Sequence, residues 1–127
     1  MAKAKVGVVV QPIRRTYRAE VALTRGQAVI QGTADDQVKL PGAANVPCIG
    51  IVEEDAAAGA PVSVIVGGEA VAIAGAAIAA GAYVQTAGAS GKVIATAAAG
   101  QNFLGRAVHA AAADADEVVL QVMFGTV

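Results

Sequence analysis

Leu23-Thr24-Arg25-Gly26-Gln27-Ala28-Val29 gives the clearest indication of the fold, because its pattern occurs twice in the chain. The second copy, Ile78-Ala79-Ala80-Gly81-Ala82-Tyr83-Val84, lies 55 residues later and keeps an apolar residue, a glycine and a valine at the same spacing. Glycine adopts a positive φ angle at little cost, so each copy predicts a sharp corner that starts a β-strand. An internal repeat of this kind indicates that one small unit is used twice.

The same 55-residue offset relates Val38 to Val93 and Ile49-Gly50 to Leu104-Gly105. It continues through the alanines at 56–58 and 111–113, after which the second copy has one extra residue. A glycine inside a strand marks a bend or a close approach of another backbone, and we expect this of Gly50 and Gly105. The predicted fold is all-β: a small barrel or sandwich of two glycine-cornered repeats, in which each repeat forms one layer.

Short β-rich runs separated by turn residues predict strands at 28–31, 37–40, 49–52 and 118–124. The clearest predicted hairpin joins Val62–Val66 to Glu69–Ala74 through Gly67-Gly68, a pair suited to a tight turn. The alanines at 76–82 favour helix by propensity, but the repeat assigns them to the turn before a strand. At most one helical turn is expected there or at 110–113.

Residues 1–20 lie outside the repeat and are predicted to form a basic N-terminal arm. A single β domain follows at 21–127, with the first repeat at about 21–75 and the second at about 76–127. Within the arm, Val6 to Gln11 is a β-branched run suited to an edge strand, and 13–20 is expected to be an exposed connector. Six of the nine basic residues lie in the first 25 positions, against Glu20 as the only acid. The arm is therefore predicted to contact a partner, with a solubilising tail as the alternative.

The composition argues against two classes of binding protein. Hydrophobic residues make up 56% of the chain, but aromatic residues only 3%, and tryptophan is absent. Sugar-binding and single-strand nucleic-acid modules expose stacking aromatics. The four aromatics are not expected to cluster, so neither nucleic acid nor sugar is a predicted partner; they are Tyr17, Tyr83, Phe103 and Phe124.

No membrane segment or signal peptide is expected. The run from Ala70 to Gly91 lacks charge, but it consists mostly of alanine and glycine and transfers poorly into lipid. It also contains half of the repeat, whose other copy carries Arg25, Asp35 and Asp36. The Val6–Val10 run is too short for a signal peptide.

The residues that most often carry catalysis do not combine here, so we predict neither an enzyme nor a metal or cofactor site. Cys48 lies in an apolar stretch and is expected to be a small core residue. His109 is the only histidine and is expected in an exposed loop. The acidic run Glu53-Glu54-Asp55 and the acids at 114, 116 and 117 lack calcium-loop spacing and favour a solvated loop or a salt-bridging contact surface.

Two lysines are candidate attachment points of a swinging-arm carrier domain, a class that also contains two β repeats. Such domains place the lysine at a hairpin tip between characteristic neighbours. Lys39 is instead predicted inside a strand, and Lys92 lacks the flanking residues. A carrier role is therefore disfavoured.

With the repeat laid out, the chain resembles the capsid cement, or head decoration, proteins of tailed bacteriophages. The resemblance covers roughly residues 20–127 and rests on pattern; the residues that carry it are 23–29, Ile49-Gly50-Ile51-Val52-Glu53-Glu54-Asp55-Ala56-Ala57-Ala58-Gly59, Val62–Val66 with Gly67-Gly68, and Ala80-Gly81-Ala82-Tyr83-Val84. It implies a structural protein, made in the host cytoplasm, that binds the outer surface of the capsid and clamps major capsid subunits. It also implies a homo-oligomer, with a trimer favoured and a dimer as the alternative.

A phage or cell-surface β binding module, such as a tail accessory or adhesin-like domain, is the alternative function. On the cement hypothesis, the capsid-binding residues are expected in the arm. Val6, Val8 and Val10 would add a strand to a sheet edge of a capsid subunit. Arg14, Arg15 and Arg18 would pair with capsid carboxylates.

Overall fold

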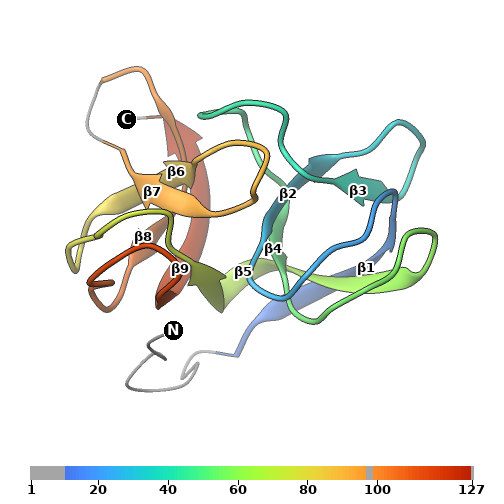
Figure 1. The fold of residues 1–127 in the computed structure, drawn as a ribbon, viewed down its shortest axis with the longest axis horizontal. Coiled ribbons are helices and arrows are strands. Elements are labelled where there is room, and N and C mark those ends of the chain that lie inside the picture. The colour runs from blue at the N-terminus through green and yellow to red at the C-terminus, as the bar shows by residue number, and fades with distance from the viewer. Residues whose placement is uncertain (1–10, 97–98, 127) are drawn as a thin grey trace.

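Two small barrels lie side by side and share one long strand, as Figure 1 shows. The computed structural model of the chain describes residues 11–96 and 99–126, which form nine strands and no helix. In chain order the strands are β1 (Ile13–Ala19), β2 (Ala28–Gln31), β3 (Gln37–Lys39), β4 (Gly50–Val52), β5 (Pro61–Ile73), β6 (Tyr83–Thr86), β7 (Val93–Ala95), β8 (Asn102–Ala107) and β9 (Glu117–Thr126). The all-β prediction is confirmed.

The first barrel closes on itself. Its strand order is β1-β3-β2-β4-β5, and β1 returns to pair with β5. The closing pair is antiparallel and sets Tyr17 opposite Val62. On its other edge, β1 meets β3 in parallel, with Ala19 opposite Val38. Closure leaves few unpaired backbone groups, which removes most of the exposed sheet edge.

The second barrel repeats this arrangement with the order β5-β9-β8-β6-β7. A parallel bridge between Ala74 and Val93 joins the end of β5 to β7, and it is the counterpart of the Ala19–Val38 pair 55 residues earlier. The repeat predicted from the sequence therefore corresponds to a repeat of the three-dimensional structure. The expectation that each copy forms one layer is wrong, because each copy curls back to pair its own first and last strands.

The glycine corners behave as predicted. Gly26 has a φ of 89° and Gly81 a φ of 84°, both in the left-handed region that favours glycine. Next to them, the Leu23–Ala56 bridge recurs as the bridge between Ile78 and Ala111.

The extra residue of the second copy enters earlier than the alanine alignment suggests. The turn bond from Ala60 N to Ala57 O recurs as the bond from Asp116 N to Ala113 O. The extra residue of the second copy therefore lies directly after Ala111, where the offset between the two copies becomes one residue larger. Runs of alanine carry no side-chain signal that could locate such an insertion.

The predicted hairpin at Gly67-Gly68 does not exist. Both glycines lie inside β5, which continues from the first barrel into the second. β1 ends its pairing with β5 at Ile13–Gly67, and β9 ends its own at Val122–Gly68. A Cβ on Gly68 would lie 2.6 Å from the Gln11 carbonyl oxygen, so glycine here admits a crossing backbone rather than a turn.

Residues 13–19 are also not an exposed connector. They form β1, in which Tyr17 and Ala19 are buried and the residues before them are exposed. Because β1 corresponds to the second half of β5 at the same offset, the structural repeat begins at about residue 13 rather than 21. Because most residues of β1 are polar or basic, the sequence pattern did not identify it as a strand of the repeat.

The core is packed from small aliphatic side chains. Ala70, Ala72 and Ala74 are fully buried at the end of β5 and pack with Val118 and Leu120 of β9. A separate cluster around Leu23 and Val64 fills the first barrel. Small side chains let strands curl tightly without leaving voids. No helix in the described residues is long and apolar enough to cross a membrane.

Several bonds hold the two barrels together besides β5. Ala28 N donates to Gly91 O at 2.8 Å, and Asn45 N donates to Thr86 O at 3.1 Å. Asn45 and Asn102 also exchange three side-chain–backbone hydrogen bonds of 2.9–3.1 Å. These bonds cross from the first repeat to the second, so the two barrels form one body.

Gly50→Ala tests the close approach at β4. A Cβ at Gly50 would meet the Ile65 carbonyl oxygen and lie 2.8 Å from a Val64 methyl group, so the backbones must separate. We expect a loss of about 2 kcal/mol or more in the free energy of unfolding, and a melting temperature lower by roughly 8 °C. Gly42→Ala is the control, because no atom lies within 4 Å of its Cβ position. Equal melting temperatures for the two variants would contradict the packing described.

Candidate functional site

The three arginines predicted to contact a partner all lie on β1 and all have partners within the first barrel. Arg14 Nε donates to both carboxylate oxygens of Glu53, at 2.8 and 2.7 Å. Arg18 Nη1 donates to Gly59 O at 2.7 Å. Arg15 forms a longer ion pair of 3.2 Å with Asp36. Val6, Val8 and Val10 lie outside the described residues.

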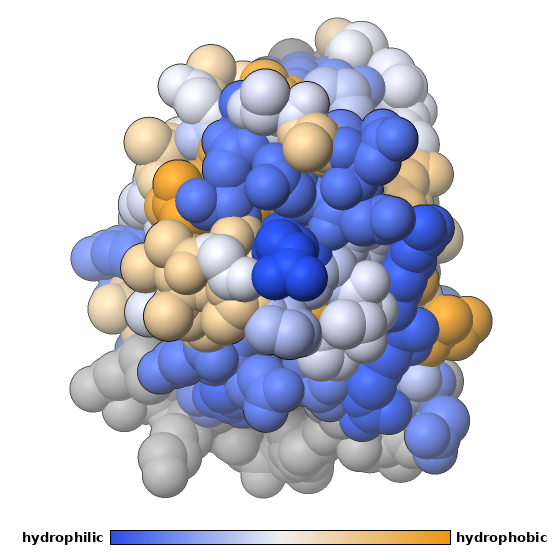
Figure 2. All heavy atoms as spheres, turned by 90° about the vertical axis from the view of Figure 1, so that its right-hand side faces the viewer, coloured by the Kyte–Doolittle hydropathy of each residue, from blue (hydrophilic) through white to orange (hydrophobic). Residues whose placement is uncertain are grey.

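Strand alternation explains how β1 positions these side chains. Arg15 shares its face with the buried Tyr17, and its guanidinium lies 5.1 Å from the centre of that ring. Arg14 and Arg18 point to the opposite, outer face. The right-hand end of the molecule, which belongs to the first barrel, is mostly hydrophilic, with apolar atoms only in separated groups (Figure 2).

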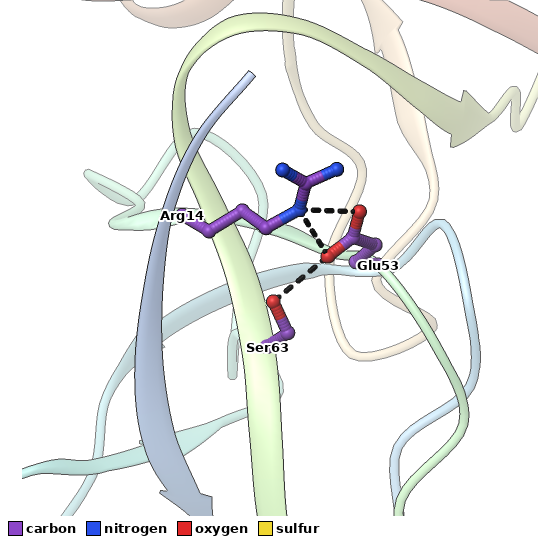
Figure 3. Close-up of polar contacts among 3 residues, drawn as sticks. All are labelled: Arg14, Glu53 and Ser63. Carbon is purple, nitrogen blue, oxygen red and sulfur yellow. Dashed lines mark hydrogen bonds and ion pairs between the residues drawn. The ribbon is translucent and has the colours of Figure 1, made fainter. Parts of the chain in front are cut away.

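Glu53 is the centre of a group of three hydrogen-bonded polar side chains on this surface (Figure 3). Its carboxylate accepts the two Arg14 bonds and a third bond of 2.8 Å from the Ser63 hydroxyl. Burial raises the pKa of Glu53, but the hydrogen bonds from Arg14 and Ser63 and the charge of Arg14 outweigh it, so the pKa lies below its usual value. The carboxylate therefore stays ionised and holds the Arg14 guanidinium in place.

A hollow of about 280 Å³ opens beside this group, and we call it the first hollow. Arg14, Glu53 and Arg25 supply its charged wall; the remaining lining residues are Pro12, Val52, Ile65 and Val71. The backbone N–H of Arg25 donates to Asp55 Oδ1 at 2.8 Å, and its Nη1 donates to Glu117 Oε2 at 2.7 Å. Glu117 belongs to β9, so this ion pair links the two barrels. Sequence reasoning missed Arg25, because its partners are 30 and 92 residues away.

Most of these acidic residues accept hydrogen bonds or ion pairs from within the fold. Asp114 pairs with Lys92 at 2.9 Å, and Asp116 Oδ2 accepts the backbone N–H groups of Ala112 and Ala113. No group of three metal-ligating side chains occurs in residues 11–96 and 99–126.

The remaining candidate residues are Cys48, His109 and Lys39. Burial raises the pKa of the Cys48 thiol to about 12, so it stays protonated at neutral pH. His109 lies half-buried in a turn after β8 rather than fully exposed. Lys39 lies in β3, as the strand prediction expected, and not at a hairpin tip.

The prediction that the aromatics do not cluster is wrong for three of the four. The rings of Tyr83 and Phe103 lie 4.6 Å apart at 38°, and Phe103 and Phe124 line a common hollow with Pro47 and Cys48. The pairing of Phe103 with Gly125 brings them together, since a Cβ on Gly125 would lie 2.6 Å from the ring. Tyr83 and Phe124 remain 41% and 45% exposed. The pairing of β6, β8 and β9 created this patch, and sequence spacing did not reveal it.

Comparisons with known proteins give one family and one similar fold. The sequence matches the family described as phage cement protein over residues 7–122. The fold is similar to the crystal structure of the head fiber gp8.5 N base in bacteriophage phi29, with a TM-score of 0.69 and 21% identity over 89% of this chain and 95% of that chain. No curated protein matches the sequence.

Glu53→Gln tests the ion pair by its pH dependence. Because the pKa of Glu53 is lowered by folding, its charge stabilises the folded state fully above the ordinary pKa of 4.5, and this contribution is lost as the pH falls through the folded-state pKa. We expect the variant to lower the free energy of unfolding by up to about 1 kcal/mol at pH 7. The difference from wild type should shrink below pH 4.5 in urea titrations. Glu54→Gln, at an exposed neighbour, is the control; a difference that stays constant down to about pH 3 argues against the ion pair.

Proposed function

The chain belongs to the phage cement protein family and is therefore a structural protein associated with the phage capsid; on this premise we propose that it binds the outer surface of the head and stabilises the contacts between major capsid subunits. The family match carries the proposal, since it extends over both barrels.

The rigidity of the two-barrel body supports this role. β5 runs through both barrels, and the Arg25–Glu117 pair and the Asn45–Asn102 bonds cross between them. A clamp must transmit load from one subunit to the next, so a body with a hinge between its halves would be unsuitable. Here the halves share backbone hydrogen bonds along one strand.

The energetics of decoration favour an oligomer, and we propose a homotrimer, with a dimer as the alternative. An oligomer that docks on a symmetric lattice makes its first contact by diffusion and its later contacts intramolecularly. Each protomer then needs only modest affinity for the major capsid protein.

The capsid contact that we propose begins in the arm, where Val6, Val8 and Val10 add a strand to a sheet edge of a capsid subunit. Because 13–19 is β1, the arm leaves the body at Gln11 rather than at Glu20. Arg14 and Arg15 follow this point at the start of β1, and Arg18 lies near the other end of the strand. All three present their remaining N–H groups to capsid carboxylates. Ile13, which is 63% exposed, provides an apolar contact at the same place.

Co-sedimentation with expanded phage shells that lack the cement protein tests the proposed function. We expect the purified full chain to pellet with the shells to a saturating occupancy and to raise the temperature at which they disassemble. Unexpanded shells are the control, since their subunits are arranged differently. Absence of the chain from the pellet would contradict capsid binding.

The arm is tested separately by removing residues 1–10, which leaves β1 intact. We expect the truncated chain to keep the wild-type melting temperature and to lose most of its binding to expanded shells. A V6S/V8S/V10S variant should weaken binding in the same way, because alternate residues of a strand share one face. V9S, on the other face, is the matched control. Full occupancy by the truncated chain would exclude the arm from binding.

A further inference from the structure

The first hollow has a counterpart in the second barrel. A second hollow of about 400 Å³ is lined by Ala80, Gly81, Arg106, Ala107, Val108 and Gln121. When the two copies of the repeat are aligned, with the one extra residue allowed for, Ala80 corresponds to Arg25, Val108 to Glu53 and Gln121 to Ile65. The same corner of the same fold is therefore hollow in both barrels.

The two hollows have different chemistry. At the positions of Arg25 and Glu53 the second barrel has Ala80 and Val108, and at the position of Arg14 it has Glu69. Since the second barrel builds the corner without the arginine pair, the fold does not require those charges. In the first barrel these arginines stabilise the fold through Glu53 and Glu117, and they also line an open hollow.

The geometry of the first hollow suits a planar anion. Glu53 binds Arg14 only through Nε, and Figure 3 shows the two Nη atoms at the free end of the side chain. None of the residues in the described ranges accepts a hydrogen bond from these Nη atoms. Arg25 is held by Asp55 at its backbone and by Glu117 at Nη1. Both guanidiniums are thus fixed while keeping unused donors, a preorganised arrangement for a carboxylate.

The rest of the hollow limits the size and charge of the occupant. Its floor is apolar, formed by Val52, Ile65 and Val71, which lowers the local dielectric and strengthens a charged hydrogen bond. Each arginine of the charged wall is already paired with one carboxylate, Arg14 with Glu53 and Arg25 with Glu117. A single carboxylate can accept the unused N–H groups of the two arginines, whereas a nucleic-acid backbone brings several further negative charges toward Glu53 and Glu117.

We propose that the first hollow receives the carboxylate of an aspartate or glutamate side chain of the major capsid subunit, held by Arg14 and Arg25. This inference rests on the proposed function and names the chemistry of the partner. It also gives Arg14 two simultaneous roles. Its Nε is bound to Glu53, and its Nη atoms face the partner.

Binding of Arg14→Gln and Arg25→Gln to expanded shells lacking the cement protein tests the inference, with Arg106→Gln as the matched control in the second hollow. We expect each of the first two variants to bind roughly tenfold more weakly per protomer, since each loses a charge-assisted hydrogen bond. Arg106→Gln should bind as wild type does. Melting temperatures identify any variant whose fold is damaged.

Cross-linking provides a second measurement where a glutamine variant folds poorly. Arg14→Lys places a primary amine in the first hollow, and a zero-length carbodiimide joins an amine to a carboxylate in direct contact. We expect mass spectrometry to find the introduced lysine joined to an acidic residue of the major capsid protein, and Arg106→Lys to give no such product. Cross-links to Glu53 alone would overturn the inference.

The outcomes separate the two proposals. If wild type binds expanded shells and the Arg14 and Arg25 variants bind equally well, the cement function stands and the carboxylate site is wrong. If wild type does not bind the shells, both are wrong.

Discussion

Both barrels are organised by β5, which changes its pairing partners along its length. Over its first half β5 pairs with β1 and β4, and over its second half with β9. The change occurs between Gly67, opposite Ile13, and Gly68, opposite Val122. Only residues without a Cβ leave room there for the chain that enters β1. One strand thus closes both barrels and fixes their relative position.

The second physical feature is the use of very small side chains where strands curl. The fully buried alanines of β5 and the close approaches at Gly50 and Gly105 let neighbouring backbones lie almost in contact. Such a core contains few large side chains that could shift, so rigidity arises from backbone pairing and tight closure. Such stiffness suits the proposed role of stabilising the contacts between capsid subunits.

Duplication also separates structural residues from residues with another role. Positions that are alike in both barrels, such as Gly26 and Gly81, serve the backbone. Positions that differ, such as Arg25 against Ala80, are free to acquire another role. The charged wall of the first hollow belongs to the second kind and lies close to where the arm leaves the body, so both proposed capsid contacts lie in one region of the first barrel.

The repeat, the all-β class, the corners at Gly26 and Gly81 and most strands could be predicted from the sequence, because glycine geometry and β-branched runs act locally. The folded structure was needed to find that Gly67-Gly68 continues a strand and that the basic residues 13–19 form β1. It also decided that Arg25 pairs with Glu117 and that Tyr83 meets Phe103. The physical reason is the same in each case. A Gly-Gly pair suits a turn and a close crossing equally well, and which one forms depends on the strand that arrives beside it. Partners 20 to 92 residues apart meet only because two barrels close around a shared strand.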